Sequence, residues 1–398
     1  MTIEHPSLAS GKTAPFLAAG TVVPALDRPF NVPLHGLRGV AALAVLWSHV
    51  IALLAFAPTV LAPFHYFSGG GAAVAFFFVL SGAVLSISLK RFTASPLAYV
   101  AYGIKRLFRL YPLLIVATAF GLAYAFLLHP LVRNAVFEPT FFGHYDEKPG
   151  PFLIVASFLG LIDKANPPTW TIFVEMIASA MLPFFVLFAR NLGRAAILTA
   201  ALLVVSFAAY QMPDSHVLLY RWPVFMVNFA AGILVLFVAY HWRETLARLS
   251  QSFRLVAVAA LFLILMNGRE LMAAGGYLYK GHADPVTNLF EMAVSFLIVL
   301  LMIDAPAMLA KSPLMRRLGN LSYGIYLLHF PTLFTITGLT VLAVGNDVLA
   351  RNTGLFATWL LVATTLVTLL LSAITWTWLE APMIALGRRI AASISKRG

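Results

Sequence analysis

Arg38 and His49 are the two side chains in this sequence whose types and spacing most clearly suggest chemistry. They lie eleven residues apart in an apolar stretch, 34–50, that is typical of a membrane-spanning helix. At about 100° per residue, eleven residues make three turns plus roughly 20°, so both side chains lie on one helix face, about 16 Å apart along the axis. Ionisable groups at such depth are costly in lipid and usually functional. The alternative is that Arg38 marks the cytoplasmic edge of the helix and His49 is a packed polar residue.

Glu175 is the next residue whose position suggests catalysis. Counted at 1.5 Å per residue, His49 lies about 12 Å and Glu175 about 11 Å below the outer boundary of a ~30 Å hydrocarbon core. The two side chains are therefore expected at one level. A carboxylate beside an imidazole raises its basicity and fixes its tautomer, which suits a general base. A buried structural pair is the alternative.

His329 lies about ten residues into a later apolar segment, at a similar depth. It is either a second histidine of the same site or the partner of a backbone carbonyl that Pro331, which lacks an N–H, leaves free. Glu380 ends the last apolar segment beside basic residues, and a helix-end salt bridge is expected there.

Arg106 and Arg109 are spaced i, i+3 near the predicted inner surface. They share a helix face and can bind phosphate groups together. Basic residues at a cytoplasmic helix end also follow from membrane topology alone. The triplet 69–71 is all glycine and allows close approach to the backbone, and Ser81 with Gly82 forms a small-residue spot suited to close helix packing.

The composition indicates an integral membrane protein. Of the 398 residues 61% are hydrophobic and only 11% are charged, and the mean hydropathy is +0.89; soluble domains are about 45–50% apolar and about 25% charged. The net charge of +12 could suggest a nucleic-acid partner, but the distribution of the charges indicates membrane topology and no nucleic acid. The chain has no cysteine, which excludes disulfides and thiolate catalysis.

Hydropathy predicts an all-α polytopic protein with ten transmembrane segments. They lie at about 37–57, 72–89, 111–129, 170–189, 195–211, 222–240, 255–272, 287–304, 319–344 and 354–379. A further apolar run, 151–162, is too short to cross and is expected to be re-entrant or interfacial, between the third and fourth spans. With both termini cytoplasmic, 20 of the 27 Lys and Arg residues fall on the inner side, as the positive-inside rule requires.

The chain is expected to form one membrane domain between two short tails. Residues 1–33 contain five prolines and lack a basic start followed by an apolar run, so they are predicted to be an irregular cytoplasmic tail and not a signal peptide. Residues 34–382 are predicted to form the transmembrane domain. Residues 383–398 are predicted to form a basic cytoplasmic tail.

Taken together and in this order, these segments resemble the acyltransferase-3 family of membrane acyltransferases. The matching segments are Leu37-Arg38-Gly39 through His49, Phe77 to Gly82, Arg106-x-x-Arg109-Leu110-Tyr111-Pro112, Trp170-Thr171 with Glu175 and Pro183, Ser322 to His329, and Glu380 with Pro382. Each motif is weak alone, but six motifs in register over residues 34–382 are a specific signal. The sequence departs from the family pattern at His35, Ala73, Ala75, Ala83 and Ser179. These positions surround the expected pocket, so acceptor or acyl specificity is expected to differ.

The resemblance implies transfer of an acyl group, usually acetyl from acetyl-CoA, to a hydroxyl of a carbohydrate such as a surface polysaccharide or lipopolysaccharide. It implies His49 as general base or acyl-accepting residue, aided by Glu175, and acyl-CoA binding at Arg38, Arg106, Arg109 and Ser81. Trp170, Tyr323 and His329 are expected to bind substrate, and no metal is expected. The segment 151–168 is expected to act as a lid or acceptor platform. The implied location is the bilayer of the bacterial cytoplasmic (inner) membrane.

A polytopic transporter or flippase of a lipid-linked sugar is the alternative, because such proteins also combine many helices with charges near the midplane. The absence of a visible inverted repeat in the sequence favours the acyltransferase.

Overall fold

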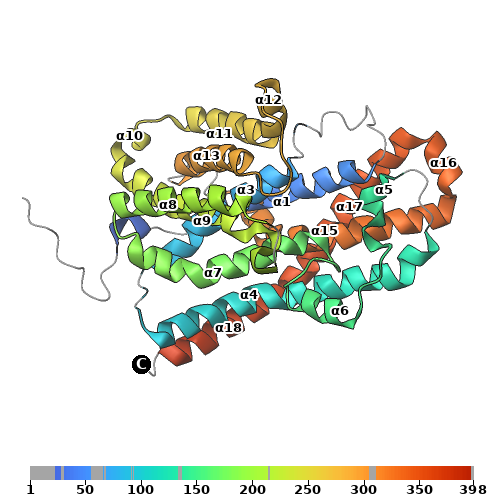
Figure 1. The fold of residues 1–398 in the computed structure, drawn as a ribbon, viewed down its shortest axis with the longest axis horizontal. Helices are drawn as coiled ribbons and strands as arrows, with labels where there is room; N and C mark the ends of the chain where they lie inside the picture. The colour runs from blue at the N-terminus through green and yellow to red at the C-terminus, as the bar shows by residue number, and fades with distance from the viewer. Residues whose placement is uncertain are drawn as a thin grey trace, which may run out of the picture.

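The helices of the protein run side by side along the long axis of the molecule (Figure 1). The structure is a computed structural model, and it describes residues 23–27, 31–54, 66, 69–90, 92, 94–132, 137–213, 216–303 and 311–395. In these ranges nine helices are long and apolar enough to cross a membrane, or ten if one bent helix pair is a single span. The predicted all-α polytopic fold is confirmed.

The long helices are α1 (Val32–Leu53), α3 (Gly70–Ser88), α4 (Pro96–Ala123), α7 (Trp170–Phe188), α8 (Leu192–Gln211), α9 (Trp222–His241), α11 (Gln251–Met266), α13 (Pro285–Met302), α15 (Pro313–Val344) and α17 (Thr353–Thr375). The short helices are α5 (Pro139–Phe142), α6 (Pro151–Phe158), α10 (Arg243–Ala247), α12 (Gly268–Ala274) and α16 (Asn346–Arg351). Helix α18 (Ala381–Ser395) follows α17 through the π-helical turn η8 (Trp376–Glu380), and a second π-helical turn, η3 (Tyr124–Leu128), extends α4.

Three regions differ most from the prediction. Helix α4 begins fifteen residues before the predicted start at 111, because Ser95 caps its first turn and Pro96 follows. The seventh predicted span is broken, since α11 and α12 meet at an angle of 70°. The predicted C-terminal tail is helical as far as Ser395 and lies along α4. Most of the predicted tail 1–33, and residues 55–57 and 396–398, lie outside the described residues.

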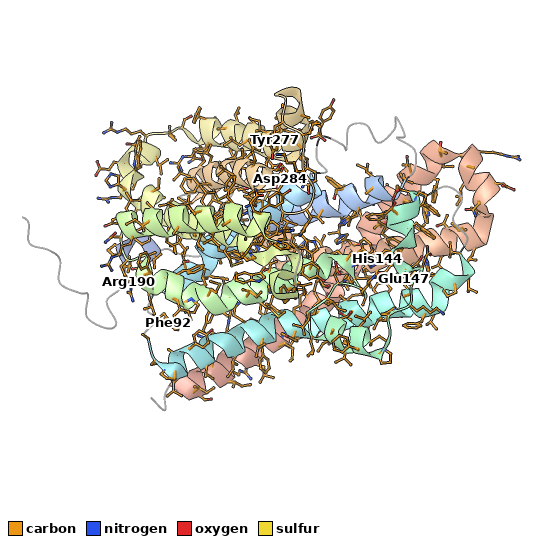
Figure 2. The ribbon with its side chains drawn as sticks, in the orientation of Figure 1. Phe92, His144, Glu147, Arg190, Tyr277 and Asp284 are labelled. Atoms are coloured by element: carbon orange, nitrogen blue, oxygen red, sulfur yellow. The ribbon has the colours of Figure 1, made fainter. Side chains whose placement is uncertain are left out.

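The connections between helices alternate between the two ends of the bundle. Phe92 and Arg190 lie toward the end that holds α10 and the C-terminus, and His144 and Glu147 lie toward the other (Figure 2). We call the first the inner end and the second the outer end, after the topology that the positive-inside rule predicts. The short helix α6, in the segment predicted as re-entrant or interfacial, exposes the apolar side chains of Phe152 and Val155.

Close backbone contacts hold the central helices together. Helix α1 lies along α15, where Gly36 is in contact with Met315 and Gly39 with Leu318. Helix α3 lies along α9, where Gly232 faces the backbone of Val79. In lipid, small residues at helix contacts allow this approach and the dispersion contacts it brings.

Replacing Gly232 by Ala is therefore expected to destabilise the fold. A Cβ atom at Gly232 would lie 2.6 Å from the backbone nitrogen of Ala83, and such overpacking costs about 1–3 kcal/mol. Gly103→Ala is the matched control, because a Cβ there meets nothing within 4 Å and alanine favours the helix by up to about 1 kcal/mol. Thermal unfolding in detergent should show a lowered Tm for Gly232→Ala only. An equal Tm for both variants would contradict the close α3–α9 contact.

Candidate active site

A polar pocket lies between α1, α3, α7 and α15 in the interior of the bundle. We call it the central pocket; its cavity volume is about 30 Å³. Its lining consists of Arg38, Val74, Phe77, Phe78, Ser81, Thr171, Ile172, Glu175, Ser322, Tyr323 and Tyr326. Four of the sequence-predicted site residues, Arg38, Ser81, Glu175 and Tyr323, are thus brought together.

Glu175 forms an ion pair with Arg106 and does not hydrogen-bond to His49. One guanidinium nitrogen of Arg106 lies 2.5 Å from Glu175 Oε1, and Arg106 Nε donates to Ser179 Oγ at 3.0 Å. The two charged side chains are only 14% and 15% exposed. The predicted pairing of Glu175 with His49 is therefore wrong. Depth along the helix axis placed both groups at one level, but the carboxylate of α7 faces the guanidinium of α4.

Arg109 lies beside a different carboxylate. Its Nη1 is 3.8 Å from Glu380 Oε2, and its guanidinium lies near the rings of Tyr323 and Trp376, at 5.5 and 6.0 Å from their centroids. The salt bridge of Glu380 is thus formed with α4. Arg106 and Arg109 each face their own acidic partner, so they do not form the shared phosphate-binding face that their spacing suggested.

Arg38 differs from these two arginines. Among the described residues no ion pair is formed by Arg38, and its buried Nε has no hydrogen-bond partner. It lies within electrostatic range of Glu175, Arg106 and Arg109. Three guanidinium groups and two carboxylates, Glu175 and Glu380, leave this region with one net positive charge, which favours an anionic ligand.

His49 is hydrogen-bonded to His329, and this pair is the most informative feature of the site. His49 Nδ1 and His329 Nε2 are 2.8 Å apart, and the ring planes are within 6° of parallel. His329 Nδ1 lies 3.0 Å from the carbonyl oxygen of Ile325. Because a carbonyl only accepts, neutral His329 carries its proton on Nδ1 and accepts at Nε2 from His49 Nδ1–H. Nε2 of neutral His49 is therefore left with a free lone pair.

The carbonyl that Pro331 leaves without its helical donor is that of Leu327, four residues earlier. It accepts a hydrogen bond from Asn166 Nδ2 at 2.8 Å. The alternative in which His329 satisfies this carbonyl is therefore wrong, and His329 belongs to the site with His49.

Phe141 of α5 lies over His49 from the outer side. Its ring centroid is 5.7 Å from that of His49, and Phe330 lies at 5.5 Å. Glu138 N donates to the carbonyl of Leu53 at 2.9 Å, which fixes this segment to the end of α1. The Glu138 carboxylate accepts from Phe141 N–H at 2.6 Å, and this bond lowers the pKa of Glu138 below its ordinary value. The Glu138 carboxylate, which caps the N-terminus of α5, thus stays ionised at neutral pH.

The segment 151–168 is predicted to act as a lid or acceptor platform, but the ring that lies over His49 comes from Phe141, outside this segment. Helix α6 lies against α4, where Tyr111 donates to the carbonyl of Leu159 at 3.0 Å. Phe141 belongs to α5, whose position at one end of a loop gave no signal in the hydropathy.

Tyr326 separates the central pocket from the histidine pair. Its ring lines the pocket and lies 6.0 Å from the ring of His329 and 5.6 Å from that of Phe77. Thr171 Oγ1 donates to its hydroxyl at 3.0 Å. The site residues that the sequence analysis did not single out are Tyr326, Ser322 and Thr171. The spacing of Ser322, Tyr326 and His329, four and three residues apart on one helix face, was the available signal.

Two predicted substrate-binding residues, Tyr323 and Trp170, have other surroundings than those predicted. Tyr323 donates its hydroxyl to the carbonyl of Leu110 at 2.7 Å, so it holds α15 on α4 as well as lining the pocket. Trp170 lines a separate pocket at the outer ends of the helices. Among the described residues no three His, Asp or Glu side chains come together as metal ligands.

These features define a polytopic membrane protein with a cationic interior pocket next to a histidine pair. The model of the acyltransferase-3 family, described as an acyltransferase domain, matches residues 31–377, which is most of the chain. The chain belongs to this family of membrane acyltransferases. Comparison with curated proteins and with solved structures gave no match.

Breaking the Arg106–Glu175 pair should destabilise the protein more than removing the pair altogether. Glu175→Leu leaves an uncompensated, mostly buried charge, which costs about 3–5 kcal/mol. The double variant Arg106→Met/Glu175→Leu should recover part of this loss in a thermal-unfolding cycle. The more exposed pair Lys90–Asp27 is the control, and Asp27→Asn should change stability by at most about 1 kcal/mol. Additive effects of Arg106→Met and Glu175→Leu would contradict the pairing.

Proposed function

We propose that this protein is a membrane O-acyltransferase that moves an acyl group, acetyl in the simplest case, from acyl-CoA at the inner side to a carbohydrate hydroxyl presented from the outer side. The observation that carries the proposal is the His49–His329 hydrogen bond, which leaves His49 Nε2 as a base inside a protein of an acyltransferase family. In the proposed orientation the inner end faces the cytoplasm of a bacterium and the acceptor is a surface glycan.

The donor is proposed to enter at Arg38. Of the three guanidinium groups in this region, that of Arg38 is the one without an acidic partner among the described residues. The contact between Arg109 and Glu380, at 3.8 Å and without a hydrogen bond, can be exchanged for a phosphate. The pantetheine arm of CoA is comparable in length to the rise of about 16 Å between Arg38 and His49. The hydroxyl groups and aromatic rings of the central pocket suit an arm that combines amides with methylenes.

Acyl transfer needs a base that later acts as an acid. His49 Nε2 takes the proton of the acceptor hydroxyl while its oxygen attacks the thioester carbonyl, the C–S bond breaks, and the proton passes from His49 to the leaving thiolate. In the second route, His49 Nε2 attacks the thioester carbonyl, the C–S bond breaks and CoA leaves as the thiolate. The acceptor oxygen then attacks the acyl group on His49, the C–N bond breaks, and the hydroxyl proton passes to the thiolate. Both routes use the same nitrogen, and in both the chain through His329 to Ile325 holds the ring and spreads the positive charge that forms on it.

The transporter alternative has less support. It rested on charges near the midplane, and Arg106 and Arg109 are paired with Glu175 and Glu380 within the bundle. Membership in an acyltransferase family favours the enzyme.

Replacing His49 by Ala should abolish transfer. Purified protein in liposomes is given labelled acetyl-CoA and an acceptor glycan, and the variant is expected to lose about 10²–10⁴-fold in kcat, as for the removal of a general base. Transfer and slow thioester hydrolysis should fall together. A folded His49→Ala protein with wild-type activity would show that the reaction takes place elsewhere.

His329 is proposed to act as a positioning residue. His329→Gln retains a side chain that can accept from His49 Nδ1–H, whereas His329→Ala does not. The glutamine variant should therefore keep more of the wild-type kcat than the alanine variant, with KM for acetyl-CoA little changed in either. The pH profile of kcat should shift in His329→Ala, because the imidazolium of His49 loses its acceptor. Equal kcat and an unchanged profile in both variants would contradict this role.

A further inference from the structure

A second pocket lies at the outer ends of α3, α7, α12 and α13. We call it the outer pocket; its cavity volume is about 50 Å³, and Tyr279 in its lining is 40% exposed, so it lies at the surface. Its lining consists of Gly71, Val74, Trp170, Phe225, Arg269, Tyr279, His282, Ala283, Asp284, Thr287, Asn288 and Glu291. Figure 2 shows Asp284, with Tyr277 close by, in this part of the molecule. The mechanism proposed above uses none of the charged groups of this pocket.

Arg269 is held firmly in the outer pocket. The 70° bend between α11 and α12 brings it there. Its guanidinium lies over the ring of Tyr279, 4.0 Å from the centroid, and its Nε is 3.5 Å from Glu291 Oε1. A side chain at Gly71 would collide with its Nη2, so the glycine at the start of α3 makes room for this arginine.

Glu291 has unfilled hydrogen-bonding capacity. Its side chain is 6% exposed, and Oε1, although near Arg269, takes part in no hydrogen bond. Asp284 differs, because its oxygens accept from the hydroxyls of Tyr277 at 2.9 Å and Thr287 at 2.8 Å, and it caps α13 by accepting from Val286 N–H at 3.2 Å. A buried carboxylate oxygen without a donor is costly. Glu291 is therefore suited to accept a hydrogen bond from a ligand.

Aromatic side chains supply the rest of the pocket surface. Trp170 is only partly buried and is fixed by Phe225, at 5.4 Å, and His282, at 4.8 Å between centroids. Tyr279 is 40% exposed. Aromatic rings can pack against an apolar face of a ligand, and the neighbouring carboxylate can accept hydrogen bonds from its hydroxyl groups. A sugar ring has both an apolar face and hydroxyl groups, so it suits this pocket.

The backbone around the pocket is strained in three places. In the described part of the chain, the non-glycine residues with positive φ are Tyr220, Arg221 and Ala283, at +54°, +50° and +62°. Ala283 lines the pocket, and the Tyr220 ring lies 6.4 Å from that of Trp170. Strained backbone is concentrated at functional sites, where the surrounding structure maintains it.

The outer pocket lies close to the helix that carries His49. Gly70, next to Gly71 of the pocket, is in contact with Ser48, the neighbour of His49 in α1. The contact between α1 and α3 therefore links the pocket to the helix that carries His49. An acceptor of several sugar units can occupy the outer pocket with one unit while another reaches the histidine.

We propose that the outer pocket binds an uncharged sugar unit of the acceptor, at a distance from the reacting hydroxyl. This rests on the proposed acyltransferase function. Trp170 and Tyr279 pack against the sugar ring, and Glu291 accepts from one of its hydroxyl groups. The pocket is lined by one cationic group, Arg269, and two acidic groups, Asp284 and Glu291, so a sugar that carries a carboxylate is disfavoured.

The test measures binding and needs no turnover. Saturation-transfer difference NMR is recorded on the full chain in nanodiscs with three neutral trisaccharides (of glucose, mannose and N-acetylglucosamine) and with trigalacturonate as the anionic probe. We expect a signal for at least one neutral sugar that falls at least tenfold in Trp170→Ala and in Glu291→Leu, which removes the acceptor oxygens, and a signal at least tenfold weaker for trigalacturonate.

Two matched controls keep the outcome clear. Trp378→Ala removes an exposed tryptophan outside the pocket, and Glu270→Leu removes an exposed carboxylate of α12; both should bind as the wild type does. His49→Ala should also bind, so loss of turnover in that variant tests the acyltransferase proposal separately. No signal for any neutral sugar, an equal signal in Trp170→Ala, or a stronger signal for trigalacturonate would overturn the proposal.

Discussion

The hydrogen bond between His49 and His329 joins the two helices on which the whole site depends. It forms only because α1 and α15 lie close together, with glycines at 36, 39 and 319 in the contact between them. The same contact places Arg38 opposite Ser322 and Tyr323 in the central pocket. A change that separated these helices would therefore move the cation, the pocket and the base together. The carbonyl of Ile325 completes the arrangement, because it decides which nitrogen of each imidazole carries a proton.

The second constraint is the free-energy cost of burying the two arginine charges of α4. Carboxylates on α7 and η8 offset this cost. Glu175 and Glu380 take up the charges of Arg106 and Arg109, which lie well inside α4. Without these partners, two guanidinium groups in the bundle would be strongly unfavourable. Arg38 is left without an acidic partner in the described part of the chain, so one positive charge remains for a ligand. The pairing also explains why α4 continues through a stretch that hydropathy assigned to a loop.

Elements that follow from local sequence were predictable, and contacts between elements were less so. The apolar segments predicted the helices. The helix period, applied to the eleven-residue spacing, predicted that Arg38 and His49 lie on one helix face. The partner of His49 did not follow. Rise per residue fixes the depth of a side chain, but the rotation of each helix and its choice of neighbour depend on packing, and α7 turns Glu175 toward Arg106. Phe141 lies on a four-residue helix, which is too short to give a periodic signal, and the outer pocket depends on a bend between α11 and α12 that composition does not encode.

The measurement that tests the central claim most directly is a structure of the protein with a non-hydrolysable ketone analogue of acetyl-CoA. The account predicts that the CoA phosphates lie at Arg38. It places the acyl carbonyl beyond Tyr326, with room between the carbonyl carbon and His49 Nε2 for one hydroxyl oxygen. That oxygen would lie about 3 Å from both atoms. If the acyl carbonyl instead lay beside Glu175 in the central pocket, with His49 shielded behind Tyr326, the histidine pair would not be the catalytic centre.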